Sequence, residues 1–133
     1  MIGRSNIFNI RSGQRWLGSV GSTRGFVDFA SRDYCIRAWL KLMRTYRMRG
    51  IVSLTQIVST FAPPTENDTR GYIGYCCDFL GCSPGFRFEC DQDYFRLALP
   101  MARVETNTHL SVKSVELCAA FWRIVIVSEN GGI

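Results

Sequence analysis

Two glutamates lie in sequence contexts that would allow a carboxyl group to act as a general acid. Glu66 follows Pro63-Pro64 at an expected loop-to-helix junction, where a rigid backbone can present the side chain at a cleft. Glu105 lies near the end of a largely apolar helical stretch, where partial burial would raise the pKa of its carboxyl group. A carboxylic acid that keeps its proton near neutral pH can protonate a leaving oxygen. Glu66 is therefore the first catalytic candidate and Glu105 the second.

Each acidic residue also has a structural interpretation. Thr65-Glu66-Asn67-Asp68 matches a capping box with Thr65 as the cap. The nearby helix N-terminus would lower the pKa of Glu66, the opposite of what a general acid needs. Glu105 could be a surface acid paired with Arg103 or another nearby Arg. Asp28 could be a second carboxylate or a solvated strand residue. The sequence leaves these alternatives open.

Several polar and aromatic side chains along the chain could bind a ligand. The candidates are amide, guanidinium and phenol side chains: Asn6, Asn9, Arg11, Asn67 and Tyr72. Asn and Arg could hydrogen-bond N-acetyl and carboxylate groups of a glycan or peptide, and Tyr72 could stack on a sugar ring. In loops, however, Asn commonly satisfies backbone groups, and a Tyr at helical spacing is more often part of the core.

The six cysteines favour free thiols over disulfides or a metal site. Three of them occupy positions where helical apolar faces accept small hydrophobic residues: Cys35, Cys76 and Cys118. One zinc-ligand set without a CxxC pair is conceivable: Cys77, Cys82, Cys90 and His109. We expect no metal, and we expect no cofactor because neither a GxGxxG nor a P-loop motif occurs.

The composition is that of a packed globular protein with a basic surface. Hydrophobic residues make up 47% of the 133, and the net charge of +5 comes from fourteen Arg and two Lys against eleven acids. This charge suits anionic partners such as nucleic acid, lipid headgroups or acidic wall peptides, or serves solubility alone. No basic cluster is dense enough to predict specific nucleic-acid binding. We expect neither a membrane span nor a signal peptide.

The apolar spacing predicts a mostly α fold (α+β), with about five helices and a small N-terminal β-hairpin. Residues 6–30 should form a hairpin or irregular segment, with strands from the apolar runs 6–11 and 25–29. Residues 31–127 should form the helical core, so that 1–133 is a single domain. From Ser31, the first helix should run to Gly50.

Caps and prolines delimit the remaining expected helices. A capping box at Ser53 starts the second helix, and the third should run from about Glu66 to Leu80, where Gly81 closes it. Asp91 or Asp93 should cap the fourth, which should kink or restart at Pro100. The fifth starts at Ser111, and residues 124–127 form its last turn or a closing strand.

Several motifs resemble a family of phage and prophage virion structural proteins. The N-terminal part of the chain is similar to that family's NPxNIR…WxG…GFxxF pattern, with Ile7 in place of its Pro. The matching stretches are residues 6–11, Trp16-x-Gly18 and residues 25–29. The octet Ala62–Thr69, followed by Tyr72-Ile73, is similar to its APPSENDTxxYI core. Residues 101–107 resemble its AxxRxENG segment, with Asn107 in place of the glycine.

The resemblance implies a lysozyme-like helical protein that acts on cell-wall peptidoglycan, as a glycosidase or lytic transglycosylase. In such chemistry, one neutral carboxylic acid protonates the leaving oxygen, while a second carboxylate or the substrate itself supports the sugar cation. Its partners would be peptidoglycan or other virion proteins, and its location the virion or the host cytoplasm. The alternative is a non-catalytic virion structural or interaction protein. A small basic nucleic-acid binder is the third hypothesis.

Overall fold

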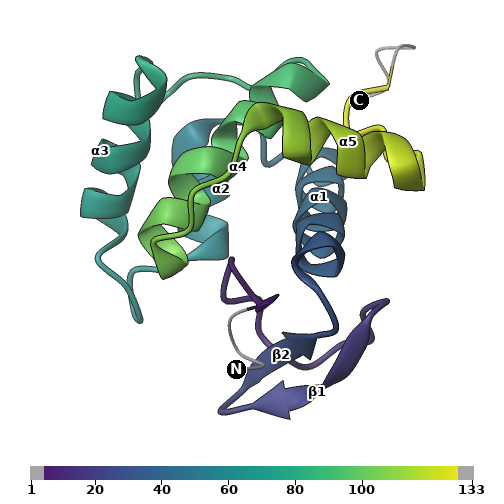
Figure 1. The fold of residues 1–133 in the computed structure, drawn as a ribbon. Coiled ribbons are helices and arrows are strands. Elements are labelled where there is room, and N and C mark those ends of the chain that lie inside the picture. The colour runs from purple at the N-terminus through teal and green to yellow at the C-terminus, as the bar shows by residue number, and fades with distance from the viewer. Residues whose placement is uncertain (1–4, 129–133) are drawn as a thin grey trace.

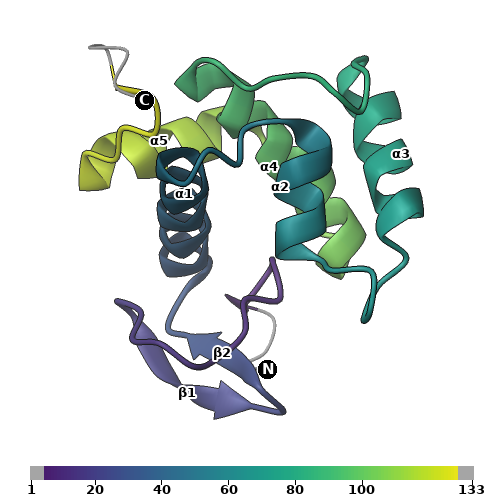
Figure 2. The ribbon, with the colours of Figure 1, turned by 180° about the vertical axis from the view of Figure 1, so that it is seen from behind.

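Five helices and one two-stranded hairpin make up the fold, as the sequence predicts. The computed structural model describes residues 5–128. The elements are β1 (Ser19–Thr23), β2 (Phe26–Phe29), α1 (Arg32–Met48), α2 (Leu54–Phe61), α3 (Thr69–Leu80), α4 (Asp91–Thr106) and α5 (Val112–Trp122). Figures 1 and 2 show the hairpin at the start of α1, with α2, α3 and α4 grouped beside α1. Helix α5 packs against the first turn of α1, where the Tyr34 and Trp122 rings lie 5.6 Å apart. The fold is mostly α with a small antiparallel sheet.

One hydrophobic core joins the N-terminal segment, β2 and the helices. Its largest fully buried side chains include Trp39 of α1 and Tyr94 of α4. Phe8 stacks on Trp39, with 5.1 Å between the ring centroids. Helix α4 packs against both α3 and α5, and α5 packs against α1. Within the described part of the chain, every helix is too short or too polar to cross a bilayer.

The prediction of a strand at residues 6–11 is wrong. This run forms a buried turn, and only Arg11 makes an isolated bridge, to Phe26. The first strand is instead β1, which pairs antiparallel with β2 through an irregularity between Ser19 and Gly21. Every β1 side chain is exposed, so this strand carries no alternating apolar pattern. Backbone pairing with the buried β2 explains why it forms where the pattern gives no signal.

Asn6 organises the buried turn. Its Nδ2 donates to the carbonyl oxygens of Ile10 (2.9 Å) and Val27 (2.8 Å), and its Oδ1 accepts from the Ile10 amide (2.8 Å). Its side chain is 2% exposed, and the Cys35 thiol also donates to Oδ1. Asn6, predicted to bind substrate, therefore binds the backbone that shapes the segment and does not reach a surface.

Local capping signals set most helix ends. Ser53 makes the predicted capping box with Gln56 at the start of α2. Ser111 caps α5 by accepting from the Ser114 amide, and Gly81 closes α3 in the left-handed conformation, with φ 69°. At the end of α4, Asn107 also adopts left-handed φ (54°), which Asn tolerates better than most side chains. Asn107 therefore closes α4 in a conformation that glycine adopts most readily.

Three expected boundaries differ from the structure. Helix α3 begins at Thr69 rather than Glu66, because Asp68 is the cap and accepts from the Gly71 amide (3.1 Å). Helix α4 continues through Pro100 without the predicted restart. Its cap residue is Cys90 rather than Asp91 or Asp93.

The stretch 124–127 is neither a helical turn nor a strand. Helix α5 ends where Arg123 takes left-handed φ (55°). The Asp91 carboxylate then accepts the backbone amides of Ile126 (3.3 Å) and Val127 (2.7 Å). Asp91 therefore anchors this irregular segment to the start of α4.

Candidate functional site

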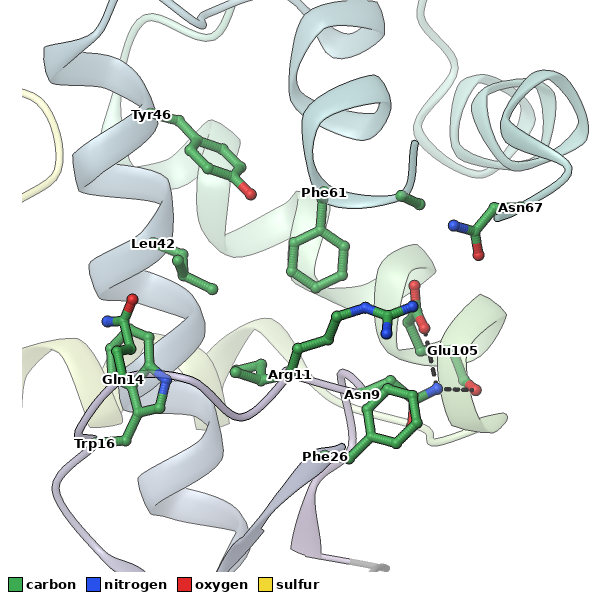
Figure 3. A pocket seen from close by; sticks show the side chains of 12 residues that line it. Asn9, Arg11, Gln14, Trp16, Phe26, Leu42, Tyr46, Phe61, Asn67 and Glu105 are labelled. Carbon is green, nitrogen blue, oxygen red and sulfur yellow. Dashed lines mark hydrogen bonds between the residues drawn. The ribbon is translucent and has the colours of Figure 1, made fainter. Parts of the chain in front are cut away.

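A pocket of about 280 Å³ opens between the N-terminal segment and the helices (Figure 3). The N-terminal segment, β2, α1, the end of α2, the loop before α3 and the end of α4 all contribute to it. Its lining residues are Asn9, Ile10, Arg11, Gln14, Trp16, Phe26, Leu42, Tyr46, Phe61, Ala62, Asn67 and Glu105. Four of the predicted site residues thus meet in one place: Asn9, Arg11, Asn67 and Glu105.

Glu105 lies in the last turn of α4 and is half-buried at the pocket wall. The Asn9 side chain fixes it, since Asn9 Nδ2 donates to both Glu105 Oε1 and the Glu105 carbonyl oxygen, each at 3.0 Å. Asn9 has left-handed φ (52°), which turns its amide from the buried turn toward α4. The suggested ion pair of Glu105 with Arg103 is not formed, because Arg103 Nε donates to Asn107 Oδ1 (3.2 Å).

Burial raises the pKa of the Glu105 carboxyl group above its usual value. The Asn9 hydrogen bond, the Tyr72 hydroxyl and the positive charge of Arg11 oppose this increase, in that order. The net direction is upward, so Glu105 holds its proton to higher pH than an exposed glutamate does. This is the direction that a general acid requires.

Tyr72 lies beneath Glu105 rather than on the surface. Its side chain is 5% exposed, so it belongs to the core and does not present a ring face for stacking. Among the described residues its hydroxyl oxygen has no partner at ordinary hydrogen-bond distance, yet it is near enough to lower the Glu105 pKa. Burial and the nearby Glu105 charge raise the pKa of Tyr72, so the phenol stays protonated.

Glu66 occupies the loop before α3 rather than its first turn. Its carboxylate forms an ion pair with Arg11, and both side chains are open to solvent, at 49% and 63% exposure. The Arg11 guanidinium also lies 5.3 Å from the centre of the Phe26 ring. Figure 3 shows Arg11 reaching across the pocket toward Asn67 and Glu105. The environment that favours a general acid is therefore found at Glu105 and not at Glu66.

A second hollow, of about 660 Å³, lies on the other side of Glu105. It shares Asn9, Asn67 and Glu105 with the first pocket. Asn67 Nδ2 donates to the Pro63 carbonyl oxygen (3.2 Å), which positions this side chain between the two hollows. Glu105 therefore faces a surface depression that extends in two directions.

Sequence reasoning missed the aromatic walls of the pocket. Phe26, Tyr46 and Phe61 line it, and each comes from a different element. Tyr46 belongs to α1 and Phe61 to α2, and aromatic residues on a helix are more often part of the core than of a pocket wall. Only the tertiary arrangement reveals that these two side chains reach beyond the core.

The other candidate chemistries have no assembled site in residues 5–128. Asp28 is 6% exposed and accepts from the Thr23 hydroxyl (2.7 Å), so it is neither solvated nor in the pocket. No group of three or more His, Cys, Asp or Glu side chains within this range is placed to hold a metal ion. All six cysteines are free thiols.

The fold and pocket define a small helical protein with one half-buried acid facing a surface depression. No family model matches the chain. It is similar to Protein P5 of Pseudoalteromonas phage PM2, with 31% identity over 84 residues, which cover 58% of this chain and 52% of that protein. The chain thus spans about half the length of the curated relative it matches. The relationship to phage proteins that the sequence predicts is confirmed at this level.

Proposed function

We propose that this phage-related protein cleaves glycosidic bonds in cell-wall peptidoglycan, with Glu105 as the general acid. The observation that carries the proposal is the half-buried Glu105 carboxyl group, with its pKa raised by burial, at the wall of the 280 Å³ pocket. This assignment reverses the order of the two sequence candidates, because Glu66 is ion-paired at the pocket mouth.

In the proposed reaction, Glu105 transfers its proton to the glycosidic oxygen as the bond to the sugar breaks. Asn9 holds one carboxyl oxygen and thereby fixes the direction of the other. Glu66 is engaged with Arg11, so we assign support of the sugar cation to the N-acetyl group of the substrate. The deprotonated Glu105 then takes a proton from the attacking water or sugar hydroxyl, in the glycosidase or lytic transglycosylase reaction respectively.

The pocket lining supports a sugar ligand. Asn9, Gln14 and Asn67 offer amide groups that can hydrogen-bond hydroxyl and N-acetyl groups, and Tyr46 and Phe61 offer apolar surface. The volume lies near the lower limit of small-molecule sites, about 300 Å³. We therefore propose that one sugar ring occupies this pocket and that the strand continues into the adjoining hollows.

The test is turnover of purified peptidoglycan by Glu105→Gln, with Glu66→Gln as the matched control. Glu105→Gln preserves shape and removes the proton donor, so turnover should fall by roughly 10²–10⁴-fold. Glu66→Gln should keep most of its activity, because it removes only an exposed ion pair. Mass spectrometry of the products separates hydrolysis from formation of an anhydro sugar. Undiminished turnover by Glu105→Gln would show that Glu105 is not the general acid.

A non-catalytic virion structural or interaction protein is the second candidate function. The supporting observation is the apolar side of α5, where Phe121 is 77% and Leu117 is 55% exposed. Exposed apolar patches on small proteins commonly mark contacts with other proteins. Wild-type protein that is folded but inactive on peptidoglycan at every pH would favour this function. For either function we propose the virion or host cytoplasm as the location, and residues 1–133 as one domain.

A further inference from the structure

A third depression, a strongly basic groove, adjoins the Glu105 pocket on the side of α1. It encloses about 830 Å³, and its lining residues are Gln14, Arg15, Trp16, Leu17, Ser19, Arg37, Lys41, Arg44, Thr45 and Met48. Four of these carry a positive charge and none carries a negative charge. The shape is open enough to hold an extended chain, and the charge selects for an anion.

Helix α1 supplies three of the four charges. Arg37, Lys41 and Arg44 follow one another at intervals of four and three residues, so they project from one face of the helix. At 1.5 Å per residue they cover roughly 10 Å of its length. Arg15 comes from the loop before β1 and completes the groove from its other side. The groove therefore offers a row of cations rather than a single one.

These four cations are not neutralised by the protein. The one ion pair among residues 5–128 joins Arg11 to Glu66, outside this groove. In addition, Arg37 Nε and Trp16 Nε1 are buried and have no hydrogen-bond partner among the described residues. The charged side-chain ends that lack an ion pair within the described chain, rather than these two covered nitrogens, are the groups that can meet an anion from outside the chain.

The groove is continuous with the Glu105 pocket. Gln14 and Trp16 line both of them. In Figure 3 these two side chains stand at one end of the pocket, and Glu105 stands at the other. A ligand seated at Glu105 would therefore extend past Trp16 onto the basic face of α1.

We infer that this groove binds the acidic peptide stems that branch from the glycan strands of the wall, an inference that rests on the proposed function. The stems carry several carboxylates on a short flexible chain, and a row of Arg and Lys side chains pairs with such groups. Nucleic acid would also match the charge. The continuity of the groove with the sugar pocket favours a branched glycan, because one ligand then occupies both.

The test measures binding separately from cleavage. Soluble wall fragments with peptide stems, and chitin oligosaccharides without stems, are titrated into protein that carries Glu105→Gln, so that no turnover occurs. The combined substitutions Arg37→Gln, Lys41→Gln and Arg44→Gln should weaken the binding of stem-bearing fragments about tenfold, as expected for the loss of three charge contacts at the protein surface. The oligosaccharide affinity should stay unchanged. If the triple variant folds poorly, the single substitution Arg15→Gln is used instead. It should reduce the affinity for stem-bearing fragments by a smaller factor and leave the oligosaccharide affinity unchanged.

The matched control removes the same charge elsewhere, at three exposed positions: Arg70→Gln, Arg87→Gln and Arg96→Gln. Stem affinity that falls equally in both triple variants would overturn the inference, because net charge alone would then explain it. Duplex DNA that binds more tightly than the stems and depends on the same three α1 residues would assign the groove to nucleic acid instead. Stem binding without any wild-type turnover would refute the proposed glycosidase and leave the groove assignment standing.

Discussion

Gly18 lies where an added methyl group would collide with a neighbouring ring. Its backbone has φ +81°, and a Cβ atom built there would lie 2.1 Å from Cγ of Tyr34. The Gly18 carbonyl oxygen also accepts the Ala30 amide (2.8 Å), so the backbone is tied to the chain that follows β2. We predict that Gly18→Ala strongly destabilises the protein.

The expected loss has two parts. Left-handed φ in a residue with a Cβ costs about 1–2 kcal/mol, and forcing a methyl group into packed atoms costs about 1–3 kcal/mol. Together they amount to about 2–5 kcal/mol, a large share of the roughly 5–15 kcal/mol that stabilises a typical domain. Gly25→Ala is the matched control, since Gly25 has φ +85° and no described atom beyond its chain neighbours lies within 4 Å of where its new methyl group would be. The Gly25→Ala variant should lose only the stability that left-handed φ costs, about 1–2 kcal/mol.

Denaturant unfolding of both variants checks the reasoning. The two free energies of unfolding should differ by the cost of the collision, and Tyr34→Ala should reduce that difference in a double-mutant cycle. Equal losses for Gly18→Ala and Gly25→Ala would refute the argument, because the ring would then make no difference.

Three further predictions concern the buried polar groups. Asn6→Ala should lower the free energy of unfolding by about 2–4 kcal/mol in a denaturant titration, because buried backbone groups lose their partners. Burial raises the Glu105 pKa, so the native state binds this proton more tightly than the unfolded state. The proton's contribution to the free energy of unfolding is complete below 4.5, the usual pKa of glutamate, and is lost as pH rises through the raised pKa. Denaturant titrations at several pH values should therefore show Glu105→Gln gaining stability relative to wild type toward neutral pH. Asp91→Ala should cost about 1–2 kcal/mol and speed hydrogen exchange at the Ile126 and Val127 amides.

The helices could be predicted because their signals are local. The Ser53 capping box and Gly81 act within a few residues of the ends they set. The start of α3 was misplaced because Thr65 and Asp68 are both good caps, and packing decides between them. Strand β1 escaped prediction because its five residues are all exposed and carry no apolar pattern.

The candidate site was predicted by residue type but not by arrangement. The sequence singled out Asn9, Arg11, Asn67 and Glu105 separately, and the structure places them around one pocket. Glu66 ranked first because a proline turn looked rigid, whereas the property that matters, burial, depends on elements distant in the chain. No local pattern could indicate that Asn9 would hold Glu105 across 96 residues.

The long-range bonds of the N-terminal segment also bear on how the protein folds as it is made. The hydrogen bond from Asn9 to Glu105 can form only after Glu105 has been synthesised. The Ile7 carbonyl oxygen likewise gains its partner, the Thr106 hydroxyl, only 99 residues later. At synthesis rates of about 5–20 residues per second, the interval is roughly 5–20 s. During that time Ile7 and Phe8, which end up fully buried, lack the α4 surface that finally covers the segment. The pocket is therefore closed by a late, entropically costly step, and folding should be slower than in a helical protein held by local contacts.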